Sequence, residues 1–121
     1  MPSSTYRILL TDADRFPASQ ADRAALKAIG AKLIEIPYGT SEEELAHVCK
    51  DIDALLVFSA KITSAVIEQM TRCQIIARCG IGYDNIDIQA AALRGIAVTF
   101  VPDYCVEEVS DHTIALMMDC W

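Results

Sequence analysis

The chain has little positive charge, no long apolar run and no recognisable export signal. Its 121 residues carry 10 Lys and Arg against 17 Asp and Glu, a net charge of −7. The clustered basic surface that nucleic acid requires is therefore not expected. No apolar run reaches the roughly 18 residues that cross a bilayer, and residues 1–5 lack the basic and apolar regions of a signal peptide. These absences predict a cytoplasmic protein that binds neither nucleic acid nor membrane.

The chain also lacks closely spaced cysteine pairs. Its five cysteines are odd in number, and none stands in a C-x-x-C pair; they are Cys49, Cys73, Cys79, Cys105 and Cys120. Zinc ribbons and redox dithiols use such pairs. We therefore expect no metal site, and reduced cysteines that serve mainly in packing.

Short apolar runs alternate with helical patterns along the whole chain. The predicted strands are 6–10, 31–36, 53–58, 74–78 and 96–100, and the predicted helices are 17–29, 40–50, 63–70, 86–94 and 106–120. Pro17 suits a first helical turn, Gly30 a helix end, and Pro37 marks the second strand as one near a sheet edge. Five strand–helix units with short connections predict a single α/β domain with a doubly wound, parallel, five-stranded, flavodoxin-like sheet. In that topology, ligands bind at the carboxyl ends of the strands.

Two carboxylates, Asp12 and Asp14, follow the first predicted strand. Such a pair can hold a metal or accept phosphate, as in response-regulator receivers, or it can cap the turn into the helix at Pro17. A receiver also needs an acceptor aspartate at the end of the third strand, where Phe58 and Ser59 stand. We therefore favour the capping role.

Two further loops at strand ends suit an anion. The loop 59–61 joins small residues to a lysine, and the loop 80–82 contains two glycines that permit positive φ and a close approach to backbone amides. Each loop also has an ordinary interpretation, with Thr63 capping one following helix and Asp84 or Asn85 capping the other. A dinucleotide-binding G-x-G-x-x-G motif is not formed, because its third glycine would stand at position 85.

The run from Ile75 to Thr113 makes these loops specific. It contains, in order, G-x-G-x-D-N-I-D, A-A, R-G-I-x-V, a proline and E-x-x-D-H. This order and spacing resembles the substrate-binding half-domain of the D-isomer-specific 2-hydroxyacid dehydrogenases, the family of phosphoglycerate dehydrogenase and the C-terminal-binding proteins. The stretch 101–108 is most similar to the C-terminal-binding-protein-like branch. The resemblance implies a substrate half-domain over residues 1–105 and a helix over 106–121 that crosses towards a nucleotide-binding domain.

The resemblance also implies the residues of a site. The substrate would lie beside Ser59, Ala60, Lys61, Gly80, Ile81, Gly82 and Cys105, and the cofactor NAD would border Ile81 and Val109. The substrate would be a small D-2-hydroxy or 2-keto acid. The family's catalytic Arg, Glu and His and its nucleotide fingerprint have no counterpart in these 121 residues, and His112 is not the catalytic histidine. We therefore expect the chain alone to be inactive and to bind NAD weakly.

Two positions depart from the family pattern. Phe100 stands where the family often has Asn, and Cys105 stands where many members place Asn or Ser beside the substrate. These departures leave the identity of the substrate open. A flavodoxin-like module that binds a small anion or a protein without catalysis is the alternative function.

The last predicted helix is apolar on most of its surface. One stripe is expected to pack on the chain's own sheet: Val106, Val109, Leu116 and Cys120. The remaining apolar residues would then face elsewhere: Ile114, Met117, Met118 and Trp121. Since an exposed apolar face is a typical interaction surface, we expect a homo-oligomer formed through this helix.

Overall fold

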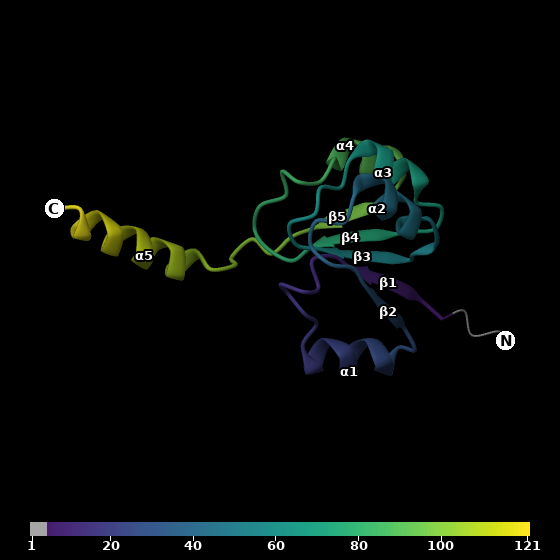
Figure 1. Cartoon of the computed structure of the whole chain (residues 1–121), viewed down its shortest axis with the longest axis horizontal. Helices are drawn as coiled ribbons and strands as arrows, with labels where there is room; N and C mark the ends of the chain where they lie inside the picture. Colours follow the sequence, from purple (N-terminus) through teal and green to yellow (C-terminus); the bar gives the residue numbers. More distant parts are fainter. Residues whose placement is uncertain (1–4) are drawn as a thin grey trace.

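A parallel sheet of five strands organises the computed structural model, which describes residues 5–121 (Figure 1). Residues 1–4 lie outside the described residues. They are the first residues of the predicted half-domain and make up most of the segment 1–5 that was considered for an export signal. The strands are β1 (Arg7–Leu10), β2 (Lys32–Glu35), β3 (Ala54–Val57), β4 (Ile75–Arg78) and β5 (Ala97–Thr99). Their order is β2-β1-β3-β4-β5, with every neighbouring pair parallel. The predicted doubly wound, flavodoxin-like sheet is confirmed, with the second strand at its edge.

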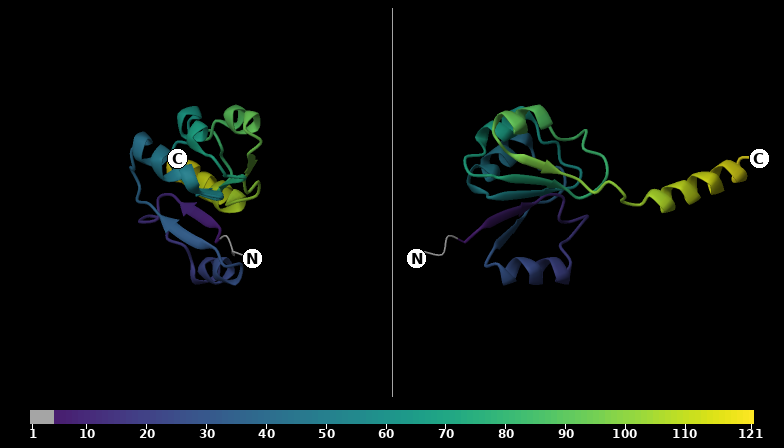
Figure 2. Two further views of the ribbon diagram at one scale, coloured as in Figure 1. Left: turned by 90° about the vertical axis from the view of Figure 1, so that its right-hand side faces the viewer. Right: turned by 180° about the vertical axis from the view of Figure 1, so that it is seen from behind.

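The helices divide unequally between the two faces of this sheet. They are α1 (Gln20–Ala28), α2 (Glu42–Val48), α3 (Ser64–Gln69), α4 (Ile88–Leu93) and α5 (Val106–Asp119), with a short 3-10 turn, η1 (Cys49–Asp51), after α2. Figures 1 and 2 show α2, α3 and α4 together on one face and α1 on the other. The core lies between the sheet and the three grouped helices. Its fully buried members include Leu9, Leu55, Val57, Ile76, Val66 and Ile67.

Capping residues decide where the helices begin. Ser19 and Asp22 form a capping box, in which each side chain accepts a hydrogen bond from the other residue's N–H. The first helix therefore starts after Ser19, and the predicted start at Pro17 is wrong. Thr63 caps α3 as predicted. Asp87 caps α4 by accepting from the N–H of Ala90 at 2.9 Å, so the prediction that Asp84 or Asn85 caps this helix is wrong.

Helix α5 projects away from the sheet (Figures 1 and 2). Its predicted packing stripe is wrong, since Val109 and Leu116 are 62% and 53% exposed and no residue of the helix is buried. The residue before it, Cys105, adopts the left-handed conformation with φ 55° and makes no side-chain cap. Within residues 5–121, no helix is both long and apolar enough to cross a membrane.

Asp53 joins three strands at the end of the sheet opposite the strand-end loops. Its carboxylate accepts the N–H of Arg7 at 2.7 Å and the Nε–H of Arg72 at 2.8 Å, and Arg72 also forms an ion pair with it at 2.7 Å. Its own N–H donates to the carbonyl of Arg7, and its carbonyl accepts from Gln74. Burial acts to raise the pKa of Asp53, but the bond from Arg7 and the charge of Arg72 outweigh it, and the net pKa is lowered.

Asp53→Asn should remove a pH-dependent part of the stability. Because folding lowers the pKa of Asp53, its contribution is present above the unfolded pKa of about 3.9 and is lost as the pH falls through the folded value. Urea unfolding should therefore show the wild type more stable than Asp53→Asn at neutral pH, with the difference shrinking as the pH falls below about 4 towards the lowered pKa of the folded state. Asp51→Asn, an exposed carboxylate nearby, is the control. A difference that does not change with pH would contradict this role.

Candidate functional site

The side chain of Asp12 holds the loop that follows β3. Asp12 is 2% exposed and sits in the left-handed region with φ 57°. One carboxylate oxygen accepts the N–H of Ser59 at 3.0 Å, the N–H of Ala60 at 3.2 Å and the hydroxyl of Thr11 at 2.6 Å. Thr11 in turn accepts the N–H of Phe58 at 3.2 Å. The end of β1 thus fixes the start of the loop after β3.

Asp14 reaches a different loop. Its carboxylate accepts the N–H of Tyr38 at 2.6 Å, after β2. The turn itself is closed by the backbone of Asp12, whose carbonyl accepts from Arg15 at 3.0 Å and Phe16 at 2.8 Å. The prediction that both carboxylates cap the turn into a helix at Pro17 is therefore wrong, because each side chain crosses to another strand end.

Asn85 joins the loops after β3 and β4. Its side-chain amide donates to the carbonyls of Phe58 at 3.1 Å and Ala60 at 2.9 Å. Its backbone carbonyl accepts from Ile62 at 2.8 Å. Sequence reasoning missed this role and considered Asn85 only as a helix cap. The loop 58–60 is consequently held from both sides, and its amides at Ser59 and Ala60 are already bonded to Asp12.

Most of the predicted site residues gather around one hollow of about 370 Å³ at this end of the sheet. It is lined by Phe16, Phe58, Ser59, Arg78, Cys79, Gly80, Ile81, Gly82, Tyr104, Cys105 and Val109. The predicted residues Ser59, Gly80, Ile81, Gly82, Cys105 and Val109 are therefore brought together. This arrangement follows from the sheet order, because adjacent parallel strands end at the same edge.

The structure places Ala60 and Lys61 elsewhere. They line a second hollow of about 230 Å³ together with Thr11, Asp12 and Tyr38. The loop 59–61 thus lies between two hollows, and only Ser59 borders both. The predicted pairing of Lys61 with the glycine loop in one hollow is not seen.

Gly80 makes room for an arginine that the sequence reasoning missed. Neither loop glycine uses the positive φ that it permits, since the glycines with positive φ are Gly30, Gly39 and Gly95. A Cβ on Gly80 would instead lie 2.6 Å from Nη1 of Arg78. Arg78 ends β4, and its buried Nε–H has no hydrogen-bond partner within residues 5–121. The only sequence signal for it was a cation directly before the glycine loop.

The backbone amides of the glycine loop are not used in hydrogen bonds within the described residues. Within the part of the chain that the structure describes, the N–H groups of Gly80, Ile81 and Gly82 donate to no protein acceptor. Among residues 5–121, Arg78 is the only charged residue that lines this hollow. Bare amides beside a guanidinium form a site for an anion, above all a carboxylate, which an arginine can bind through two bonds.

Two other polar side chains of the hollow have raised pKa values. Burial raises the pKa of the Cys79 thiol, and hydrogen bonding to Cys105 raises the pKa of the Tyr104 hydroxyl. No His, Asp or Glu is among the residues that line the hollow. The described residues of the hollow can therefore bind and orient an anion, but they supply no general base.

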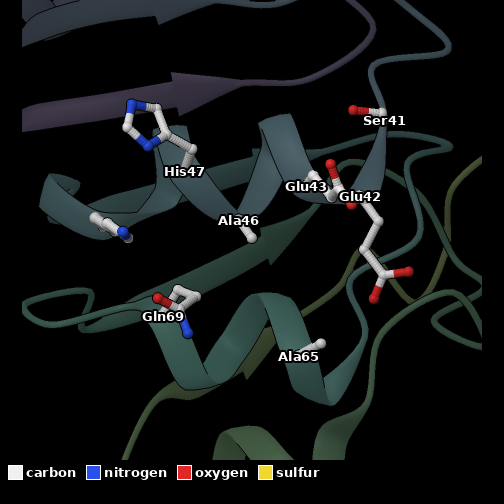
Figure 3. Close-up of a pocket in the computed structure, with 8 residues that line it drawn as sticks. Ser41, Glu42, Glu43, Ala46, His47, Ala65 and Gln69 are labelled. Carbon is white, nitrogen blue, oxygen red and sulfur yellow. The ribbon is translucent and has the colours of Figure 1, made fainter.

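Another hollow, of about 780 Å³, is a surface groove between α2 and α3 (Figure 3). It is lined by Ser41, Glu42, Glu43, Ala46, His47, Lys50, Ala65 and Gln69, none of them a predicted site residue. Its clearest polar contact is structural, since Glu42 accepts a hydrogen bond from Thr63 at 2.6 Å. Among residues 5–121, no group of three His, Cys, Asp or Glu is arranged to hold a metal ion.

Comparison with known proteins matches the same part of the chain. The family model of the D-isomer specific 2-hydroxyacid dehydrogenase catalytic domain matches residues 8–115. The D-3-phosphoglycerate dehydrogenase of Methanocaldococcus jannaschii is 37% identical over 113 residues, which are 93% of this chain and 20% of that protein. The glyoxylate reductase of Pyrococcus furiosus is 41% identical over 85 residues, covering 69% of this chain and 24% of that protein.

The fold is matched by a solved structure as well. The NAD+-bound 3-phosphoglycerate dehydrogenase of Entamoeba histolytica superimposes with a TM-score of 0.80 at 28% identity, over 94% of this chain and 38% of that chain. The chain thus spans between a fifth and a quarter of the length of these two curated relatives.

Asp12→Ala should destabilise the chain by about 2–4 kcal/mol, because it leaves two partly buried amides and a buried hydroxyl without their acceptor. Asp12→Asn should cost less, since asparagine keeps an acceptor oxygen and tolerates the left-handed conformation. Asp14→Ala, which removes one exposed bond, should cost about 1 kcal/mol. Urea unfolding measures all three. Equal losses of unfolding free energy for the alanine substitutions at Asp12 and Asp14 would show that the contacts of Asp12 do not hold the loop.

Proposed function

This chain belongs to the D-isomer specific 2-hydroxyacid dehydrogenases, and on that premise we propose that it forms the substrate-binding part of an NAD-dependent oxidoreductase. The reaction would oxidise the CH–OH group of a D-2-hydroxy acid, or reduce the matching 2-keto acid. One observation carries the proposal: Gly80, Ile81 and Gly82, whose N–H groups have no acceptor among residues 5–121, line one hollow together with Arg78.

The substrate carboxylate would bind to these amides and to Arg78. A carboxylate has acceptor positions on two oxygens, and the three N–H groups together with the guanidinium supply enough donors for both. The loop carries no net charge of its own, so the cation of Arg78 provides the long-range attraction. Ser59 and Cys105 border the same space and would contact the carbon next to the carboxylate.

NAD would contribute the hydride acceptor. Ile81 and Val109 both line the hollow and are 45% and 62% exposed, which suits the apolar surface that a nicotinamide ring needs. The chain's own residues bind and orient the acid, whereas removal of the hydroxyl proton needs a base that the hollow does not contain. The 121 residues alone should therefore show no NAD-dependent turnover.

Anion binding without catalysis is the second candidate function. It is favoured by the described lining of the hollow, in which Arg78 is the one cation and no His, Asp or Glu is present. Both functions use the same carboxylate site. They differ in whether a base and a nucleotide site act on the bound acid. NAD-dependent turnover by an enzyme that contains this chain would support the dehydrogenase function over anion binding alone.

Gly80→Val should abolish binding of pyruvate by the chain. The added side chain would displace the guanidinium of Arg78, because even a Cβ would lie 2.6 Å from Nη1, and it would cover the neighbouring amides. Arg78→Met should weaken binding at least about fivefold by removing the charge. Lys61→Met is the matched control and should leave binding nearly unchanged. Titrations followed by ligand NMR signals measure the affinities. If Lys61→Met weakened pyruvate binding and Arg78→Met did not, the carboxylate would bind in the other hollow, beside Lys61.

We also propose that two copies associate through α5. Ile114, Met117, Met118 and Trp121 line an apolar hollow of about 440 Å³ on this helix, and Met118 is 74% exposed. Such a face on a projecting helix is complementary to itself across a twofold axis, as in a symmetric dimer.

Met118→Glu should shift the chain towards monomer, because a charge in the paired face would lose its hydration. Light scattering over a range of concentrations should show a mass that rises with concentration for the wild type and stays at one chain for the variant. Leu93→Glu, on the exposed surface of α4, is the control and should behave as the wild type. A wild type that stays monomeric at high concentration would rule out this association.

A further inference from the structure

We propose that the hollow selects monocarboxylic 2-oxo and 2-hydroxy acids with a flat apolar substituent, above all an aryl group. Phe16 and Phe58 would form the subsite for that substituent. This inference rests on the proposed function, because it assumes that Gly80–Gly82 and Arg78 bind the substrate carboxylate. It adds the class of side chain that the substrate carries.

The two aromatic rings form a stacked wall of the hollow. Their centroids are 4.5 Å apart and their planes differ by 9°, and both residues line the space that contains Arg78 and Gly80. A flat apolar substituent would extend this stack, which is the offset arrangement that aromatic rings prefer. A methyl substituent would leave most of the ring surface uncovered.

The wall is held in place before any ligand arrives. The N–H of Phe16 donates to the carbonyl of Asp12 at 2.8 Å. Phe58 donates its N–H to Thr11 at 3.2 Å and accepts at its carbonyl from Asn85 at 3.1 Å. Both rings therefore sit on backbone fixed by the buried strand-end network. A preorganised wall costs little ordering entropy when a ligand binds.

The charge of the hollow argues against a second anionic group on the substrate. Arg78 is the only charged side chain of the described part of the chain that lines it, and the substrate carboxylate would pair with that cation. A phosphate or second carboxylate would then lie against aromatic faces, which carry partial negative charge, and would lose hydration without a partner. The other walls include the sulfur atoms of Cys79 and Cys105, which are polarisable and suit an aromatic ring.

A series of acids tests the inference on the wild-type chain. Pyruvate, 4-methyl-2-oxopentanoate, phenylpyruvate and 3-phosphoglycerate share a carboxylate and differ in the group beyond it. Amide shifts of the labelled 121-residue chain should move at Gly80 and Gly82 with the first three acids. Phenylpyruvate should bind roughly tenfold more tightly than pyruvate, and 3-phosphoglycerate more weakly than phenylpyruvate. The ring protons of Phe16 and Phe58 should shift with phenylpyruvate alone.

Phe58→Ala tests the wall itself. It should reduce the preference for phenylpyruvate over pyruvate to about twofold while pyruvate still binds. Phe100→Ala is the matched control. The ring centroids of Phe100 and Tyr83 are 5.1 Å apart, and Phe100 is not among the residues that line the hollow, so the preference for phenylpyruvate over pyruvate should persist. Equal affinities of the wild type for pyruvate and phenylpyruvate, or tighter binding of 3-phosphoglycerate, would overturn the inference and leave the proposed function standing. No shift at Gly80 or Gly82 with any acid would overturn both.

Discussion

The carboxylate of Asp12 is the contact on which the arrangement of the strand-end loops depends. It is buried, it accepts two backbone amides and a hydroxyl, and its own residue sits in the left-handed region. A buried carboxylate is stable only when donors satisfy it, so the loop after β3 must adopt the conformation that presents its amides. Asn85 bonds the same loop from the other side. Together they determine where Phe58 and Ser59 stand, and so fix one wall of the hollow.

The fold could be predicted from the sequence to a large extent, because its elements are signalled locally. Buried strands appear as short apolar runs, and Thr63 marks a helix start beside the residues that it caps. The prediction failed where two signals competed, as with Pro17 and Ser19, or where a partner lies far along the chain. Helix α5 illustrates a further limit: its apolar pattern predicted packing on the sheet, but no residue of the helix is buried.

The candidate site was predicted in part for the same reason. The glycine loop and Cys105 were identified through a resemblance, and the adjacency of β3 and β4 brings them to one hollow. The roles of Asp12 and Asn85 could not be predicted, because their side chains reach loops 47 and 27 residues away. Arg78 was missed because its contact with Gly80 is visible only in three dimensions. The guanidinium occupies the volume that a side chain on Gly80 would fill. Lys61, which looked like the natural cation, lies in the neighbouring hollow.

The position of a bound carboxylate is the most direct test of the proposed binding role. A crystal structure of the 121-residue chain soaked with a 2-oxo acid such as pyruvate would show it. The carboxylate should lie about 3 Å from the amide nitrogens of Gly80, Ile81 or Gly82 and within hydrogen-bond reach of the Arg78 guanidinium. A carboxylate bound instead beside Lys61 and Tyr38, or in the groove between α2 and α3, would contradict the assignment of the site.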